Sequence, residues 1–211
     1  MTKHSQIVTV LGCLLAGIAC GQTNPKLART IDSLYQIDQD VQSKIMAAIN
    51  NKIPFDSIQK LQDLEQHIFK KHIPLIKSIY SKHGYPTKEK VGQQASTHFF
   101  VLIQHSDNDP AFQAEMLPIL EKLSKEGKVS RADYAYLYDR VQRNTGGMQR
   151  YGTQLSYDEN GNLFDNQNRI IYPKDLAEPH KVDERRKEVG LEPIEQYYEQ
   201  VLKMLGRPRK K

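Results

Sequence analysis

His105 and Asp107 are the pair of residues best suited to catalysis in this sequence. They lie two positions apart, with His105 at the end of an expected helix and Asp107 in the turn that follows. An imidazole titrates near neutral pH and is a common general base, and a neighbouring carboxylate can orient it. We therefore expect His105 to act as a base with Asp107 as its orienting partner. The alternative is that His105 makes a structural hydrogen bond and that Asp107 is only a turn residue.

A second group of polar residues is a candidate for ligand binding. Uncharged Gln and Tyr side chains offer donors and acceptors that suit either a polar ligand or a buried network. Two arginines could clamp an anion, or one could form an ion pair between elements. The candidate ligand-binding residues are His83, Asp139, Arg140, Gln149, Tyr151, Gln154 and Arg186.

The turn after His105 and the segment 149–154 are expected to meet in space. Both are polar, and the segment has a glycine at its centre, Gly152, so neither suits an apolar core on its own. A buried donor or acceptor without a partner costs about 1–3 kcal/mol, so the polar groups of the two segments must find partners. Pairing with each other is the simplest solution.

Metal and cofactor chemistry finds no support in the sequence. His98 and His105 are seven residues apart, about 10 Å along a helix, which is too far for two ligands of one ion. The sequence contains no GxSxG, P-loop, dinucleotide-binding or HExxH motif. We therefore predict no metal and no cofactor.

The first 19 residues are typical of a signal peptide. Lys3 and His4 precede an apolar run, residues 7–19, that is too short to span a bilayer. The run ends in Gly-Ile-Ala before Cys20, a pattern that predicts cleavage and lipidation of Cys20. Cys13 is a rival lipidation site, and free secretion or an uncleaved anchor are alternatives. We expect an exported protein of the cell envelope, held to a membrane by its N-terminal lipid through a tether at 20–25.

Cysteine and charge usage restrict the remaining chemistry. Both cysteines lie within the first 20 residues, so we expect no disulfide and no thiolate nucleophile in the domain. The chain has 30 basic and 25 acidic residues, but four of the basic ones lie in the last five positions. The positive excess therefore belongs to a tail, residues 206–211, which we expect to be disordered. We predict no nucleic-acid partner.

Apolar residues recur at helical spacing over most of the chain. Helices are expected over 26–50, 56–80 with a break or kink at Pro74, 87–105, 110–127, 130–145, 182–189 and 193–205. Residues 149–157 and 163–172 flank an Asp-Glu-Asn-Gly-Asn turn, a pattern that predicts a β-hairpin. The predicted fold is a mainly α single domain over 26–205 with one inserted β-hairpin.

Five sequence blocks resemble those of an uncharacterised bacterial domain family that is frequent on lipoproteins. The blocks are HGxPT, QHxDxDPxFQ, YLxDR, QxYGTQ and RRxxVGL, spread from His83 to Leu191. Tyr85 stands where a Trp is also common, and both are aromatic. The resemblance implies a domain of unknown function and supplies no activity.

Two functions remain open from the sequence. One is a non-catalytic envelope domain that binds a polar ligand or a protein, its polar residues forming a network that fixes the fold. The other is a small envelope hydrolase or transferase with His105 as general base. The first is favoured because no complete catalytic signature is present.

Overall fold

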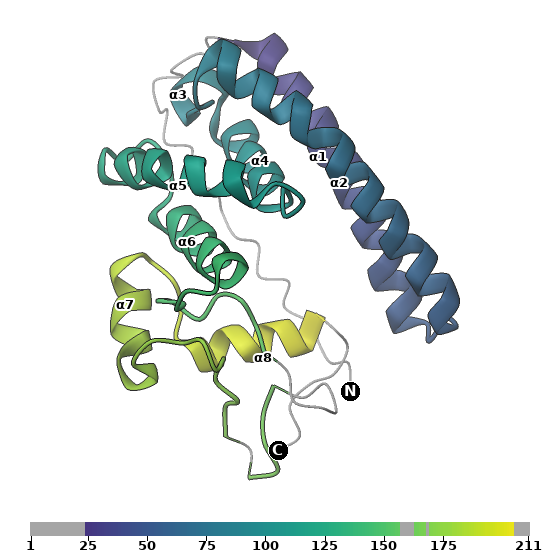
Figure 1. The fold of residues 1–211 in the computed structure, drawn as a ribbon, viewed down its shortest axis with the longest axis vertical. Coiled ribbons are helices and arrows are strands. Elements are labelled where there is room, and N and C mark those ends of the chain that lie inside the picture. The colour runs from purple at the N-terminus through teal and green to yellow at the C-terminus, as the bar shows by residue number, and fades with distance from the viewer. Residues whose placement is uncertain (1–23, 157–162, 168, 205–211) are drawn as a thin grey trace, which may run out of the picture.

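A long helical hairpin forms one side of the molecule (Figure 1). The computed structural model describes residues 24–156, 163–167 and 169–204. Helix α1 (Pro25–Asn50) begins where the Asn24 side chain accepts a hydrogen bond from the Leu27 N–H, with proline as its first residue. It packs against α2. The other helices are α2 (Phe55–His83), α3 (Lys88–Val91), α4 (Gln93–Gln104), α5 (Pro110–Lys125), α6 (Arg131–Thr145), the 3₁₀ turn η1 (Pro179–Lys181), α7 (Val182–Glu188) and α8 (Ile194–Met204).

The main hydrophobic core surrounds α4, which contacts α1, α2, α5 and α6. Phe99 and Leu102 of α4 are fully buried, as is Met116 of α5. Burial of such side chains stabilises a fold by about 1.5–3 kcal/mol each. Helix α4 is therefore held rigidly from several sides, and its C-terminal end delivers His105 to a fixed position.

A second hydrophobic cluster lies in the C-terminal part of the chain. Helices α7 and α8 lie on the side of α6 away from the α1/α2 hairpin (Figure 1). The cluster is separate from the main core, and it consists of Leu163, Leu176, Val182, Ile194, Tyr198, Val201 and Leu202. The two clusters are linked through α6 and the polar segment 149–154.

The prediction of a β-hairpin is wrong. The described residues contain no strand, and only two isolated bridges occur there, Gln149 with Leu176 and Phe164 with Ile170. Gly152 has a φ of +64°, which interrupts an extended strand. The backbone N–H groups around it bond to side chains and are not available for a β-ladder. The expected turn, 158–162, lies outside the described residues.

The predicted helices are otherwise confirmed, with two local differences. Helix α2 continues through Pro74, which is exposed. The helix expected over 87–105 is divided at Gly92, whose φ of +83° is in the left-handed region. The mainly helical character of the fold is therefore confirmed.

Asp133, in the first turn of α6, makes the stability of the domain depend on pH. Burial raises its pKa to about 6, although a hydrogen bond from the Ser130 backbone acts in the opposite direction. The unfolded value is near 3.9. Between these two values the native chain holds a proton that the unfolded chain releases, so stability decreases as the pH rises from about 4 to 6.

The variant Asp133→Asn keeps an oxygen acceptor for Ser130 and removes the buried charge. We expect its free energy of unfolding to exceed that of wild type by about 2–3 kcal/mol at pH 7.5 and to equal it at pH 4, as measured by urea unfolding. Glu115→Gln, an exposed carboxyl on α5, is the control and should change neither value. An equal gain at both pH values would contradict the assignment.

Candidate functional site

The imidazole of His105 is fixed by residues of α1 and α2. Its Nδ1 lies 3.0 Å from Asp38 Oδ2, and its Nε2 lies 3.2 Å from Nε2 of Gln42. The ring stacks on Phe69 with 4.5 Å between the centroids. An amide nitrogen only donates, so Nε2 of His105 accepts and Nδ1 donates its proton to Asp38. Nδ1 of His105 therefore carries a proton toward Asp38, and Nε2 faces Gln42.

Asp38 is a fully buried carboxylate between two histidines. Its Oδ1 lies 2.6 Å from Nδ1 of His72, which is itself buried. Burial raises the pKa of Asp38, but hydrogen bonds and charge from His105 and His72 outweigh it, so the pKa is lowered. Asp38 is thus ionised at neutral pH and orients His105.

Glu65 is a second carboxyl near this pair. Burial raises its pKa, with a smaller raising effect from Asp38 and a lowering one from His105. The pKa values of Asp38 and Glu65 are therefore shifted in opposite directions at one place. Carboxyl groups whose pKa values are shifted apart in this way are a common feature of acid–base sites.

Sequence reasoning missed Asp38, His72 and Glu65. A signal for Asp38 was present, because it occupies the buried stripe of α1 together with Leu34, Val41 and Ile45. A carboxylate on an apolar stripe is almost always paired when buried. His72 and Glu65 carry no comparable signal.

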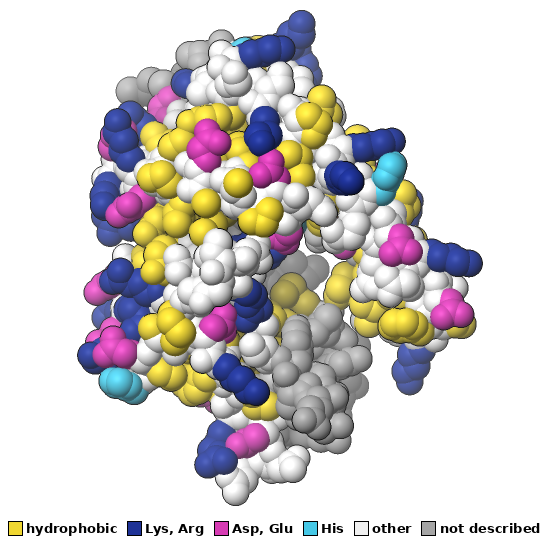
Figure 2. All heavy atoms as spheres, viewed as in Figure 1, with side chains coloured by type: hydrophobic (Ala, Val, Ile, Leu, Met, Phe, Trp, Pro, Cys, Tyr) yellow, Lys and Arg dark blue, Asp and Glu magenta, His cyan; other side chains and the backbone are white. Residues whose placement is uncertain are grey.

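Asp107 does not contact His105 through any hydrogen bond or ion pair in the described residues. It forms an ion pair of 2.6 Å with Arg140 and accepts hydrogen bonds from Gln113 and Asn144. On the other side of the same turn, Asn108 donates to Gln66 of α2. The turn after His105 therefore connects α2 with α6. Beyond it, the far half of the α1/α2 hairpin stands away from the rest of the molecule (Figure 2).

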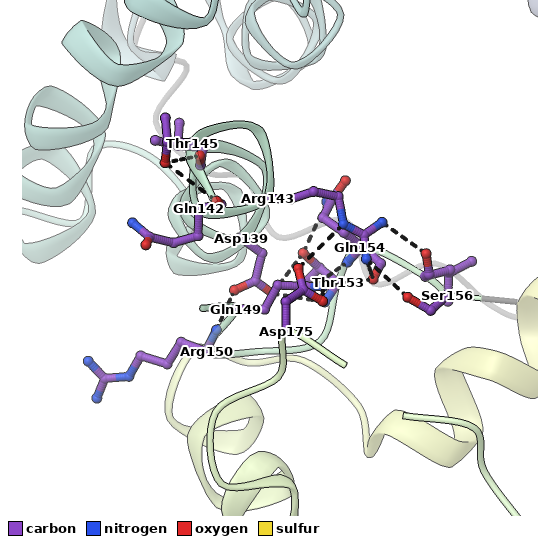
Figure 3. A network of polar contacts seen from close by, with 12 residues as sticks. Asp139, Gln142, Arg143, Thr145, Gln149, Arg150, Thr153, Gln154, Ser156 and Asp175 are labelled. Carbon is purple, nitrogen blue, oxygen red and sulfur yellow. Dashed lines mark hydrogen bonds and ion pairs between the residues drawn. The ribbon is translucent and has the colours of Figure 1, made fainter. Parts of the chain in front are cut away.

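Asp139 organises the segment 149–154 (Figure 3). Its carboxylate, fully buried, accepts the backbone N–H of Arg150 at 2.7 Å, of Tyr151 at 3.1 Å and of Thr153 at 2.8 Å. It also accepts the Thr153 hydroxyl at 3.0 Å. Burial raises the pKa of Asp139, and these hydrogen bonds reduce the size of that rise. Asp139 thus fixes the course of this loop.

Gln149 and Arg186 complete the buried network. The Gln149 side chain bonds the backbone N–H and C=O of Gln154 and the carboxylate of Asp175. Arg186, fully buried on α7, donates to the carbonyls of Tyr151 and Glu192. These residues seal the loop between α6 and α7, which favours a structural role for the polar groups.

The remaining predicted residues lie apart from each other. Arg140 pairs with Asp107 and Arg186 with backbone carbonyls, so the two arginines do not form a joint anion clamp. His83 is exposed at the end of α2 and lines a pocket of about 410 Å³, to which neither His105 nor segment 149–154 contributes. No hydrogen bond joins His105 to segment 149–154 in the described part of the chain. The turn after His105 is joined instead to α6, through the ion pair of Asp107 with Arg140.

Two absences hold for the residues that the structure describes. None of their His, Cys, Asp and Glu side chains forms a group of three or more that could hold a metal ion. None of the helices in those ranges combines the length and apolar character required to cross a membrane.

The fold and the site define a mainly helical domain with a buried aspartate–histidine pair at the end of its central helix. The chain belongs to a family of unknown function, DUF6624, whose model matches residues 25–207. The expectation of a domain family of unknown function is thereby confirmed. No curated protein and no solved structure matches the chain.

Proposed function

We propose that this domain is an acid–base enzyme, a hydrolase or transferase, with His105 as its general base. The observation that carries the proposal is the Asp38–His105 contact, which places the proton on Nδ1 and leaves Nε2 able to accept one. The buried carboxylate also stabilises the imidazolium that forms when Nε2 takes a proton. Asp38 therefore has the orienting role that the sequence suggested for Asp107.

Glu65 is the proposed general acid. Its pKa is raised by burial while that of Asp38 is lowered, so a proton remains available on Glu65 to a higher pH than on an ordinary glutamate. Gln42 is half-buried and bonds Nε2, and Gln66 and Asn108 are exposed nearby in the connecting turn. Amide groups suit a polar, uncharged part of a substrate.

A hydrolysis panel tests the proposal. The purified chain is assayed on chromogenic esters, phosphate esters and glycosides, and His105→Asn is expected to lower the rate by about 10²–10⁴-fold. The rate should fall as Glu65 ionises, and because burial raises the pKa of Glu65, that fall should lie at a higher pH than for an ordinary glutamate. His67→Asn is the matched control, because His67 is exposed on α2 and should leave the rate unchanged.

Turnover and unfolding measurements together separate this role from a structural one. His105→Ala takes a partner from the buried Asp38 carboxylate, so it should lower the free energy of unfolding by about 3–5 kcal/mol whether or not His105 is catalytic. The absence of any turnover that depends on His105, measured with His105→Asn under conditions where the variant is folded, would contradict catalysis.

Binding without catalysis is the second candidate function. Among the described residues, the side chain bonded to Nε2 is the Gln42 amide, which is not a nucleophile. A polar ligand or an envelope protein could use the same groups as hydrogen-bond partners. In that case ligands should raise the melting temperature of wild type but not of His105→Asn, and no product should form.

We also propose that the chain is exported and anchored to a membrane by a lipid on Cys20. The basic start, the short apolar run and the small residues before Cys20 support this. These residues lie outside the described ranges. The anchored location makes substrates or partners of the cell envelope the relevant ones to test.

A further inference from the structure

Arg150 presents an unpaired positive charge from a rigidly held backbone. Its N–H bonds Asp139 at 2.7 Å, and its C=O accepts from Arg185 Nε at 2.6 Å. The side chain points away from the buried network (Figure 3), and its guanidinium lies 5.8 Å from the Tyr151 ring centroid. No described carboxylate forms an ion pair with it. The loop is thus fixed while its cation stays available.

Arg150 lines a pocket of about 260 Å³ between α5, the start of α6 and the end of α7. Arg131, the first residue of α6, lines the same pocket, and it too forms no ion pair with a described residue. Two unpaired guanidinium groups therefore face one small cavity. Guanidinium groups offer several N–H donors in a planar arrangement that matches phosphate oxygens.

Tyr134 and Tyr151 add two hydroxyl groups to the pocket lining. Burial raises the pKa of Tyr134 to about 12 and also raises that of Tyr151. Both hydroxyls therefore keep their protons at neutral pH and can donate. Neither makes a hydrogen bond with a described residue.

The charges that line the pocket leave a positive balance. Lys125 and Glu121 neutralise each other in an ion pair of 2.6 Å. Glu188 is exposed and opposes one of the two free arginines. One net positive charge remains. The two guanidinium groups and two hydroxyls point more hydrogen-bond donors into the pocket than a planar carboxylate can accept, and this favours a phosphate.

We propose that this pocket binds the phosphate group of a small phosphorylated ligand. Arg131 and Arg150 hold its oxygens from two sides, and the Tyr134 and Tyr151 hydroxyls donate to it. The phosphate can belong to a free metabolite or to the headgroup of phosphatidic acid, since both present a phosphate monoester. The site is separate from His105 and does not depend on the acid–base proposal.

The test is a titration of the full chain with inorganic phosphate at constant ionic strength, followed by amide NMR shifts. We expect saturable shifts at residues 131, 134, 150 and 151, and at least fivefold weaker binding in Arg150→Gln and Arg131→Gln. Arg169→Gln is the matched control, because Arg169 is an exposed arginine outside the pocket.

A second arm distinguishes the source of the phosphate. Vesicles that contain phosphatidic acid are compared with vesicles of phosphatidylcholine alone, using wild type and Arg150→Gln without the lipid anchor (Cys20→Ser). Retention on phosphatidic acid that Arg150→Gln abolishes supports the site with a lipid headgroup as ligand. The proposal is overturned if the phosphate shifts match those from chloride, or if both arginine variants bind phosphate as tightly as wild type, and vesicle retention does not depend on Arg150.

Discussion

Asp139→Ala is expected to lower the free energy of unfolding by about 4 kcal/mol. The substitution removes the acceptor of three backbone N–H groups and one hydroxyl, all in segment 149–154. Each buried donor without a partner costs about 1–3 kcal/mol. The four donors together cost less than four times this value, because the loop can relax and water can enter to replace part of the lost hydrogen bonding. Urea unfolding at neutral pH measures the loss as a lower midpoint at unchanged slope.

Asp165→Ala provides the control for this experiment. Asp165 lies in a local turn, and its partners are Gln167 and the exposed Arg169, so its loss should cost less than about 1 kcal/mol. A double-mutant cycle with Arg186→Met extends the test, because Arg186 binds the Tyr151 carbonyl from the other side of the loop. A coupling of more than about 0.5 kcal/mol is expected. A loss below 1 kcal/mol in Asp139→Ala would show that the loop keeps its course without this carboxylate.

Cys20→Ser is expected to move the protein from the membrane fraction to the soluble fraction. Lipidation requires a thiol, and the proposed anchor uses that of Cys20. A single acyl chain holds a protein only marginally, so tight retention of wild type implies more than one chain. Fractionation and immunoblotting of a bacterial host that expresses the full sequence measure the change.

Cys13→Ser is the matched control for the lipid anchor. It alters the other cysteine of the leader and should leave the protein on the membrane. If Cys13→Ser releases the protein and Cys20→Ser does not, the anchor is at Cys13. If neither releases it, the anchor is not a lipid on cysteine.

The helices could be predicted because their apolar residues repeat at the period of the element that they form. Segment 149–154 could not, because its polar residues take their partners from distant elements. The Asp139 carboxylate reaches it from α6 and Arg186 from α7. Alternation of residue types suggested a strand, and Gly152 with these side-chain bonds produced an irregular loop instead.

The candidate site shows the same limit. His105 could be selected from its type and its position at a helix end, but its partner could not be chosen by proximity in sequence. Asp107, two residues away, was the obvious choice, and the structure pairs His105 with Asp38, 67 residues away. Only the position of Asp38 on the apolar stripe of α1 indicated that it needed a partner.

The buried apolar residues form separate clusters, so parts of the chain can unfold independently of one another. The cluster beneath α7 and α8 is joined to the main core through a small apolar group, Ala135, Tyr151 and Leu191, and through hydrogen bonds to segment 149–154. Water replaces hydrogen bonds more readily than apolar contacts. We therefore expect α7 and α8 to separate from the main core before the core itself unfolds. The amides of α7 and α8 then exchange with solvent at a lower free energy than those of α1 and α4. His105 and Asp38 belong to the part that stays folded, so the pair persists through such partial unfolding.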